Sequence, residues 1–587
     1  MRNEIKRKKQ FSRRALVFGG AAGCLVTGLI SRLYYLQVIK GDKYRTLSDS
    51  NSVKLAIIPP PRGVILDRHN LQMAKNRNFY RILYSPNKAI DYHKIVGILT
   101  DILKLTPEQQ KVMLLKIKRS PRLTVELYDH LTWEELAHLN IRLPDLPGIE
   151  IEMGKMRDYP FGMSAAHLLG YVGSLDKKQL EANPFLNHPD LKVGKNGIEK
   201  AQEETLRGKV GVRRMEIDAR GLTIRELSRE ESVIGNTLKL TIDSRLQTHA
   251  QQHMQNNGAL VMLDIPTGDV LCMYSSPSYD ANQFIYPDYL KSLMRNPLKP
   301  FLNRCISATY PPGSTFKVSV ALAALEAGVI DENTSFFCGG GLALGNHYFH
   351  CWKEDGHGTI STVNAIAQSC DTFFYNTARK LGIDLMSEMA FRVGLGKRTG
   401  IELPSEYAGL IPTRPWKKNV LKQEWQQGDN FNTGIGQGYV STTPLQLALM
   451  IARITSNKQV EPRIIKAAHA PQFSDLHISE KSRAVVRKGM ETVVNSPLGT
   501  AYAHRIEAPE FAMAGKTGTA QVVSKKNEDK VAEKETHALF VAYAPMSHPR
   551  YAIGIIAEHG GHGGTTAAPI AKEMLTKAQE LKSGETS

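Results

Sequence analysis

A serine and a lysine three positions apart are the first residues in this sequence whose types and spacing could perform chemistry. Ser314 and Lys317 lie in the stretch YPPGSTFKVSVALAALEAG, in which two prolines and a glycine precede an almost wholly apolar run. The run predicts a buried helix over residues 314–327 that ends at Gly328. Burial disfavours the charged form of a lysine. A neutral Lys317 on the same helix face as Ser314 could therefore accept the serine proton and activate a nucleophile.

The same Ser-x-x-Lys spacing occurs elsewhere in the chain without that context. Ser85 and Lys88 have a proline between them, and Ser174 and Lys177 lie in the polar segment GSLDKKQ. A short pattern of common residues is expected to recur by chance in a long chain. Only the pair at 314 and 317 stands on a predicted buried helix, and we take it as the candidate nucleophile and base.

The triplet Ser-Cys-Asp at 369–371 is the second candidate. It immediately precedes the apolar segment TFFYNTARKL, which predicts a helix that ends at Gly382. Asp371 would be the N-cap of that helix. Ser369, at the corner before the helix, could relay a proton between the lysine and a leaving group.

The run Lys-Thr-Gly-Thr at 516–519 is the third candidate, and it opens an alternating stretch that predicts a strand. Lys516 supplies a cation and the two threonines supply hydroxyls at one edge, a combination that suits a carboxylate. Gly518 lets the backbone of a ligand approach closely. The three motifs in this order are far more specific than any one of them.

Three cysteines and a histidine within 33 residues raise the question of a metal site. Cys338, Cys351, His357 and Cys370 have 12, 5 and 12 residues between them in turn. A Cys3His set matches a structural zinc site in number and type of ligand. A metal bond at Cys370 would also fix the corner that carries Ser369 and Asp371.

Two other interpretations of these residues stay open at this stage. In an oxidising compartment Cys338 and Cys351 could form a disulfide, or the thiols could be buried and unrelated. For the fourth metal ligand, Cys338 has three competitors nearby, which are His347, His350 and Asp355. Zinc is the expected occupant, and no motif for an organic cofactor is present.

The N-terminus predicts a membrane anchor. Residues 1–14 hold seven basic side chains and one acid, and residues 15–39 are mostly apolar. A stretch of that length spans a bilayer, with its basic end held in the cytoplasm. No small-residue cleavage site follows, which disfavours a signal peptide. The net charge of +18 would also suit nucleic acid, but the chain shows no nucleic-acid-binding signature. We expect a single-pass protein whose bulk lies outside the cytoplasm.

The elements that must position the candidate residues form an α/β pattern. At 587 residues, the chain is long enough for two to four domains. Strands are predicted in GALVMLDIPTGDVLCMYSS, GKTGTAQVV, HALFVAYAP and YAIGIIAE, and a final helix over about 565–581. A largely helical middle separates the first two strands from the last three. This order predicts a mainly antiparallel sheet flanked by helices.

The order Ser-x-x-Lys, Ser-x-Asx, Lys-Thr-Gly resembles that of the penicillin-binding proteins and serine β-lactamases. The stretches RGVILDRHN and GKNGIEKAQEETLRG, with the anchor, resemble class B penicillin-binding proteins, and the triplet SCD with the insertion GHG is most similar to their elongation-specific branch. The resemblance implies five segments: a cytoplasmic tail (1–14), a transmembrane anchor (15–39), an elongated α+β pedestal or dimerisation-like domain (40–235), a transpeptidase domain (236–581) and a C-terminal tail (582–587).

The resemblance also implies roles for the candidate residues. Ser314 would attack the penultimate D-Ala of a peptidoglycan stem peptide, and the acyl group would then pass to the amine of a neighbouring stem peptide. Lys317 would be the base and Ser369 a proton relay. The terminal carboxylate would be held by Lys516, Thr517 and Thr519, beside Gly518. β-Lactams would acylate Ser314. The branch also implies a metal site at the Cys/His positions, an inner-membrane location with the bulk periplasmic, and contacts with a RodA-type SEDS glycosyltransferase and an MreC-type scaffold.

One residue departs from the wider superfamily, which has asparagine where this chain has Asp371. A carboxylate cannot donate the hydrogen bond of an amide, so Asp371 would serve as a partner of Lys317 or a helix cap. Two alternatives to a transpeptidase are a D,D-carboxypeptidase or β-lactamase-like hydrolase, and a non-catalytic activator of a glycan polymerase. The anchor and the long segment before residue 236 disfavour the first, and the intact motifs disfavour the second.

Overall fold

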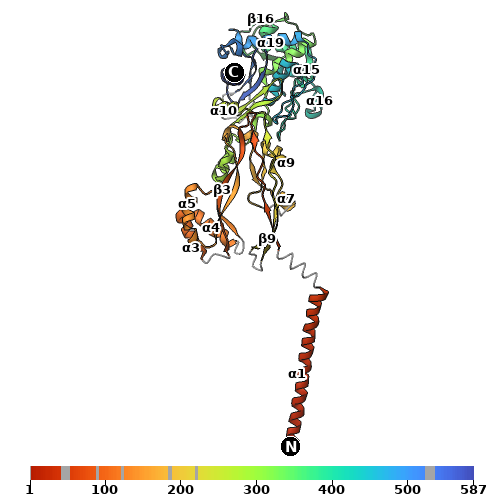
Figure 1. Cartoon of the computed structure of the whole chain (residues 1–587). Helices are drawn as coiled ribbons and strands as arrows, with labels where there is room; N and C mark the ends of the chain where they lie inside the picture. Colours follow the sequence, from red (N-terminus) through yellow and green to blue (C-terminus); the bar gives the residue numbers. More distant parts are fainter. Residues whose placement is uncertain are drawn as a thin grey trace. The chain divides into compact units, whose positions relative to one another are not determined.

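Figure 1 shows the computed structural model of the chain, which describes residues 2–40, 53–86, 91–119, 124–182, 188–217, 223–521 and 536–586. The chain divides into two compact units. The first contains residues 1–60, 177–188 and 208–234, and the second contains residues 61–176, 189–207 and 235–587. The charged stretch 524–535 lies outside the described residues.

The first unit begins with the expected apolar helix. Helix α1 (Arg2–Tyr34) continues into the π-helical turn η1 (Tyr35–Ile39). Residues Arg13–Ile39 are long and apolar enough to cross a membrane, and none of these residues is fully buried in the protein. Among the described residues this is the one helix with that property. The unit also holds helix α7 (Lys177–Ala182) and an antiparallel sheet of β1 (Val53–Ile58), β8 (Gly211–Ile217) and β9 (Thr223–Glu230).

The N-terminal part of the second unit is built on a long hairpin-like pair of strands, β3 and β5, joined by shorter strands and small helices. The strands are β2 (Ile65–Leu66), β3 (Gln72–Tyr84), β4 (Val125–Tyr128), β5 (Ile149–Asp158), β6 (Val172–Ser174), β7 (Lys192–Gly194) and β10 (Leu238–Lys239). The helices are α3 (Tyr92–Leu103), α4 (Pro107–Arg119), α5 (Trp133–Arg142), α6 (Ala166–Leu169), α8 (Gly197–Ala201) and α9 (Glu203–Arg207). Helices α3 to α5 bury their apolar faces in a core of their own, as their amphipathic sequences predict.

The C-terminal part contains the predicted antiparallel sheet, in the strand order β12-β11-β19-β18-β17. Its strands are β11 (Gly258–Asp264), β12 (Val270–Ser276), β17 (Ala514–Ala520), β18 (His537–Ala544) and β19 (Tyr551–Ala557). All four neighbouring pairs are antiparallel. Because successive strand side chains point to opposite faces, Val261 and Met262 enter different cores. Helix α18 (Pro444–Ser456) covers one face, and α10 (Ser244–His253) and α20 (Gly563–Thr586) cover the other.

The helical middle of the chain packs beside this sheet and carries two of the three motifs. A 3-10 turn η7 (Gly313–Phe316) leads into α13 (Lys317–Glu326), which packs against α15 (Asp371–Arg392). Helix α15 is broken at Gly382, where the backbone leaves helical geometry as the sequence predicts. The remaining helices are α11 (Pro287–Arg295), α12 (Arg304–Ser307), α14 (Thr362–Ala367), α16 (Arg414–Trp416), α17 (Gln427–Gly434) and α19 (Glu480–Asn495).

Two small antiparallel hairpins precede α14. They pair β13 (Ser335–Cys338) with β16 (Gly358–Ser361) and β14 (Gly341–Leu344) with β15 (His347–His350). Gly356 has a φ of 73°, and a Cβ there would lie 2.1 Å from the Cys338 carbonyl oxygen. This glycine therefore allows the chain to bring His357 back beside Cys338.

A buried histidine makes the stability of the second unit depend on pH. His167 in α6 donates a hydrogen bond from Nε2 to the Pro300 carbonyl at 2.6 Å, and burial lowers the pKa of His167 to about 4. The unfolded chain therefore binds more protons than the folded chain between about pH 4 and pH 6.5, and stability falls as the pH falls through that window. We expect acidification from pH 7.5 to 5 to cost about 2 kcal/mol of unfolding free energy through this residue.

The measurement is urea unfolding of the wild type and of His167→Gln at both pH values. The glutamine keeps a donor for Pro300 but does not titrate, so its loss of stability on acidification should be smaller by that amount. An equal loss in the two proteins would contradict the assignment.

Candidate active site

Ser314 and Lys317 stand where the sequence places them, at the entry to the buried helix α13. The turn before them is tight: Gly313 has a φ of 52° and donates its N–H to the Gly436 carbonyl at 2.9 Å. Ser314 is half-buried, whereas Lys317 is fully buried. The serine hydroxyl thus stands nearer the surface than the lysine beneath it.

The ammonium group of Lys317 is held by the Ser-Cys-Asp corner. Its Nζ lies 2.7 Å from Asp371 Oδ1, 2.8 Å from the Ser369 carbonyl oxygen and 3.3 Å from Ser369 Oγ. An ammonium has three donors, and three acceptors surround this one. The prediction of a neutral Lys317 rested on its burial alone. The structure places a carboxylate against it, so Lys317 and Asp371 form a buried ion pair.

The structure shows Asp371 in the first of its two predicted roles, as the partner of Lys317, and not as the cap of α15. Cys370 occupies the N-cap position of α15, and Asp371 is the first helical residue. Its carboxylate points away from the helix end because both oxygens are engaged: Oδ1 by Lys317 and Oδ2 by the backbone N–H of Trp352 at 2.9 Å. Ser369 has a φ of 57°, a left-handed conformation that turns the corner.

Trp352 is a site residue that the sequence did not single out. Besides its backbone contact with Asp371, its Nε1–H donates to the carbonyl oxygens of Gln368 and Ser369, both at 3.1 Å. Both Trp352 and the buried Lys317 therefore form hydrogen bonds that stabilise the turn at residues 369–371. The sequence feature that could have identified Trp352 is its position next to Cys351, one of the candidate metal ligands.

The third motif lies on β17, beside the turn that carries the nucleophile. A Cβ at Gly518 would lie 2.9 Å from Thr315 Cγ2 and 3.0 Å from the Pro312 carbonyl oxygen. The sequence predicted close approach by a ligand, and the structure shows that the chain's own turn takes this space. Thr517 Oγ1 is hydrogen-bonded to Thr500 Oγ1 at 2.6 Å, so Thr500 is a second residue that the sequence analysis missed.

Lys516 is fully buried, and its Nζ donates to the Thr517 carbonyl at 3.0 Å. Burial, followed by the positive charge of Lys317, lowers the pKa of Lys516 well below its ordinary value. The two lysines share this site with the carboxylate of Asp371. An anionic ligand would stabilise the charged form of Lys516 and is therefore favoured there.

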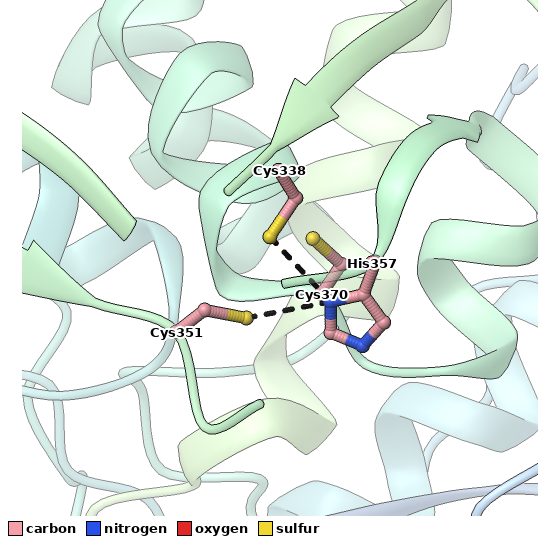
Figure 2. Close-up of side chains that lie close together, drawn as sticks. All are labelled: Cys338, Cys351, His357 and Cys370. Carbon is pink, nitrogen blue, oxygen red and sulfur yellow. Dashed lines mark hydrogen bonds between the residues drawn. The ribbon is translucent and has the colours of Figure 1, made fainter. Parts of the chain in front are cut away.

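The four candidate metal ligands converge from separate segments, as Figure 2 shows. Cys338, Cys351, His357 and Cys370 each offer one ligand atom, and these atoms all lie within 4.8 Å of one another. His357 Nδ1 is 3.5 Å from Cys338 Sγ and 3.6 Å from Cys351 Sγ. The described residues include the three competitors for the fourth place, His347, His350 and Asp355, and none of them belongs to this group.

The geometry of this cluster fits a tetrahedral zinc ion. With zinc–sulfur and zinc–nitrogen bonds of about 2.3 and 2.1 Å, sulfur and nitrogen ligands lie about 3.6 Å apart. All six cysteines of the chain are free, including Cys338 and Cys351. A hydrogen bond between Cys351 and Cys370 lowers the pKa of the first thiol and raises that of the second. Deprotonated thiol is the form that binds metal.

Comparison with known proteins agrees with this arrangement. Residues 258–576 match the penicillin-binding protein transpeptidase domain family, and residues 57–240 match the penicillin-binding protein dimerisation domain family. The peptidoglycan D,D-transpeptidase MrdA of Salmonella typhimurium is 35% identical, over 97% of this chain and 96% of the relative.

Two solved structures are similar over most of the chain. One is a complex between penicillin-binding protein 2 and MreC from Helicobacter pylori, with a TM-score of 0.78, 31% identity, and coverage of 90% of this chain and 99% of that one. The other is a peptidoglycan synthase complex that coordinates polymerization and crosslinking, with a TM-score of 0.72, 28% identity, and coverage of 96% and 97%.

Proposed function

Because the chain belongs to the class B penicillin-binding proteins and is a peptidoglycan D,D-transpeptidase of cell elongation, we propose that Ser314 is the residue that carries its acyl group. The observation that supports this choice is the environment of Lys317. A buried lysine one turn after the serine has all three of its hydrogens directed at the Ser369–Asp371 corner. The lysine, three residues after the serine, is therefore fixed in place and connected to a chain of groups that can hold a proton.

The acylation step follows from these contacts. The Ser314 hydroxyl attacks the carbonyl of the penultimate D-Ala, and its proton passes to Lys317. To act as a base, Lys317 must first lose one of its three ammonium protons. Asp371, whose Oδ1 lies 2.7 Å from Lys317 Nζ, is the group placed to accept that proton. Ser369 Oγ, at 3.3 Å from the lysine, then relays a proton to the departing D-Ala amine. The amine of a second stem peptide takes the acyl group from Ser314 and forms the cross-link.

The strand β17 holds the other end of the substrate. The terminal carboxylate of the stem peptide, or the carboxylate of a β-lactam, binds Lys516 with the hydroxyls of Thr517 and Thr519. The backbone N–H groups of Ser314 and Thr519 stabilise the oxyanion. Close packing of Gly313 against Thr519, where a Cβ would lie 2.7 Å from the threonine carbonyl oxygen, supports this pairing of turn and strand.

Peptide mapping of the penicilloyl adduct tests this assignment. After reaction with penicillin and digestion with trypsin, the added mass should lie on the peptide of residues 305–317 and localise to Ser314. An adduct on the peptide that contains Ser369 would exchange the roles of the two serines and overturn the mechanism.

The membrane topology and partners extend this function. The basic residues before the apolar helix support a cytoplasmic N-terminal end and a catalytic unit that acts on the periplasmic side of the inner membrane. The likeness to the H. pylori penicillin-binding protein 2 that was solved with MreC supports an MreC-type scaffold as a partner. The likeness to the peptidoglycan synthase complex supports a RodA-type SEDS glycosyltransferase as the polymerase that supplies uncross-linked strands.

Zinc held by Cys338, Cys351, His357 and Cys370 is part of the same proposal. Its contribution is structural: four bonds tie the two small hairpins to the N-terminus of α15, where Cys370 stands between Ser369 and Asp371. Cys351 is followed by Trp352, whose backbone N–H binds Asp371. The ligands therefore restrain both groups that orient Lys317, namely the corner and the tryptophan.

Native mass spectrometry of the full-length chain in detergent tests for zinc. We expect a mass gain over the denatured chain, lost on chelation, of which about 60 Da belongs to this cluster. His357→Ala should gain about 60 Da less than the wild type, and His347→Ala, in the same loop but outside the cluster, should gain as much as the wild type. Acylation by penicillin should slow by about 10²-fold without zinc, because small displacements of catalytic groups have effects of that size. A chain about 2 Da lighter than its fully reduced form, without metal, would show a disulfide instead.

A further inference from the structure

A second group of metal-ligating side chains lies away from the active site, where the helices α10 and α20 meet. His249 and His253 belong to α10, and Glu573 belongs to α20. One ligand atom from each of the three lies within 4.8 Å of the other two. These helices pack against each other on the sheet face opposite α18. Neither the catalytic motifs nor the Cys/His cluster contributes to this group.

The two histidines are arranged as a chelating pair. They are four residues apart, so they share one face of the helix, and their ring centroids lie 4.2 Å apart. Both side chains are half-buried, and Glu573 is exposed. His249 Nε2 is buried, and within the described part of the chain no hydrogen-bond partner satisfies it. A buried polar atom without a partner costs free energy, and a metal ion would supply the missing bond.

The surrounding charges permit a cation. Glu573 contributes a negative charge directly to the group. Lys577 lies one turn later on α20, and its ammonium group is directed to Glu580 at a distance of 3.8 Å. Lys577 adds positive charge near His249, but its own ion pair is with Glu580 and not with Glu573.

From this geometry we propose that His249, His253 and Glu573 bind a divalent transition-metal ion that fastens helix α20 to helix α10. Two imidazoles and a carboxylate suit zinc, copper or nickel, and a set of three protein ligands leaves a coordination position for water. The role that we assign to the ion is structural, because its ligands come from two helices that pack against each other.

The two helices that the metal ion would join, α10 and α20, also contact other parts of the second unit. Helix α10 starts at Ser244, whose Oγ donates to Asp67 Oδ2 at 2.6 Å. Helix α20 packs on β17, β18 and β19. Metal binding would therefore stabilise the C-terminal helix against the start of the transpeptidase domain. The rate of acylation should not depend on it, because none of the ligands touches the active site.

The test measures zinc bound by the full-length chain in detergent, by equilibrium dialysis and metal analysis, in the wild type and three variants. His253→Gln and Glu573→Gln remove ligands near the surface, and Lys577→Gln is the matched control on the same helix. We expect His253→Gln to bind about one equivalent less than the wild type and Lys577→Gln to bind the same amount. Zinc should raise the melting temperature of Lys577→Gln more than that of His253→Gln, by a few degrees, and Glu573→Gln should need a higher zinc concentration.

Equal zinc content in the wild type and His253→Gln would overturn the proposal. The comparison is independent of how many ions the Cys/His cluster holds, because that cluster is the same in all four proteins. Unchanged acylation rates in the variants would show that they are folded, whereas a rate lowered in step with zinc content would overturn the structural role.

Discussion

Replacement of Ser314 by alanine is expected to abolish covalent labelling by a fluorescent penicillin. No other group can form the acyl bond if Ser314 is the nucleophile, and loss of a serine nucleophile lowers turnover by about 10⁶-fold in well-studied serine enzymes. The side chain is half-buried and removal of its hydroxyl leaves the packing of α13 intact. The labelled band should therefore disappear on a denaturing gel while the melting temperature stays close to that of the wild type.

Ser319 provides a matched control on the same helix. Its hydroxyl is buried and has no hydrogen-bond partner among the described residues, so Ser319→Ala removes a hydroxyl at little or no cost in stability. This variant should label at the wild-type rate. Persistent labelling of Ser314→Ala would mean that another residue carries the acyl group.

Replacement of Asp371 by asparagine is expected to damage the enzyme, although asparagine is what the wider superfamily has at this position. Asp371 uses both oxygens as acceptors, one for Lys317 and one for the N–H of Trp352. An asparagine has a single carbonyl oxygen, so its NH2 group would face one of these donors. Breaking a buried ion pair on one side costs about 3–5 kcal/mol. We expect the second-order rate constant of penicillin acylation to fall by about 10²–10³-fold.

The control for this variant is Asp384→Asn, on the same helix α15. Asp384 pairs with Arg414 at 2.9 Å, but its side chain is 67% exposed, and exposed pairs contribute little. It should acylate at the wild-type rate. An Asp371→Asn protein that also acylates at that rate would show that the carboxylate does not hold Lys317 in the working enzyme.

Much of the fold follows from periodicity in the sequence. The all-apolar helix after Ser314, the strand at 514–520 and the antiparallel sheet are confirmed, because each is buried on a face that its side-chain pattern defines. The small hairpins around residues 335–361 were not predicted. Their strands are four residues each and largely exposed, so they carry little hydrophobic signal.

The sequence predicts the residues of the site mainly where they belong to one short motif. Ser314 and Lys317 share a helix, and spacing alone relates them. The contact of Asp371 with Lys317 was one of two roles predicted from the absence of the usual asparagine, whereas its contact with Trp352 joins separate segments and no local pattern encodes it. A cap is the ordinary role of an aspartate before a helix, and here a buried ammonium competes successfully for the carboxylate. The Cys/His spacing identified the candidates, but only the return of the chain at Gly356 explains why Cys338, and not a nearby histidine, completes the group.

The most direct measurement is of the product that the full-length enzyme makes from uncross-linked glycan strands. After muramidase digestion, mass spectrometry should detect cross-linked stem-peptide dimers together with released D-Ala, and neither with Ser314→Ala. Release of D-Ala by the wild type without any dimer would contradict transpeptidation and identify the enzyme as a D,D-carboxypeptidase.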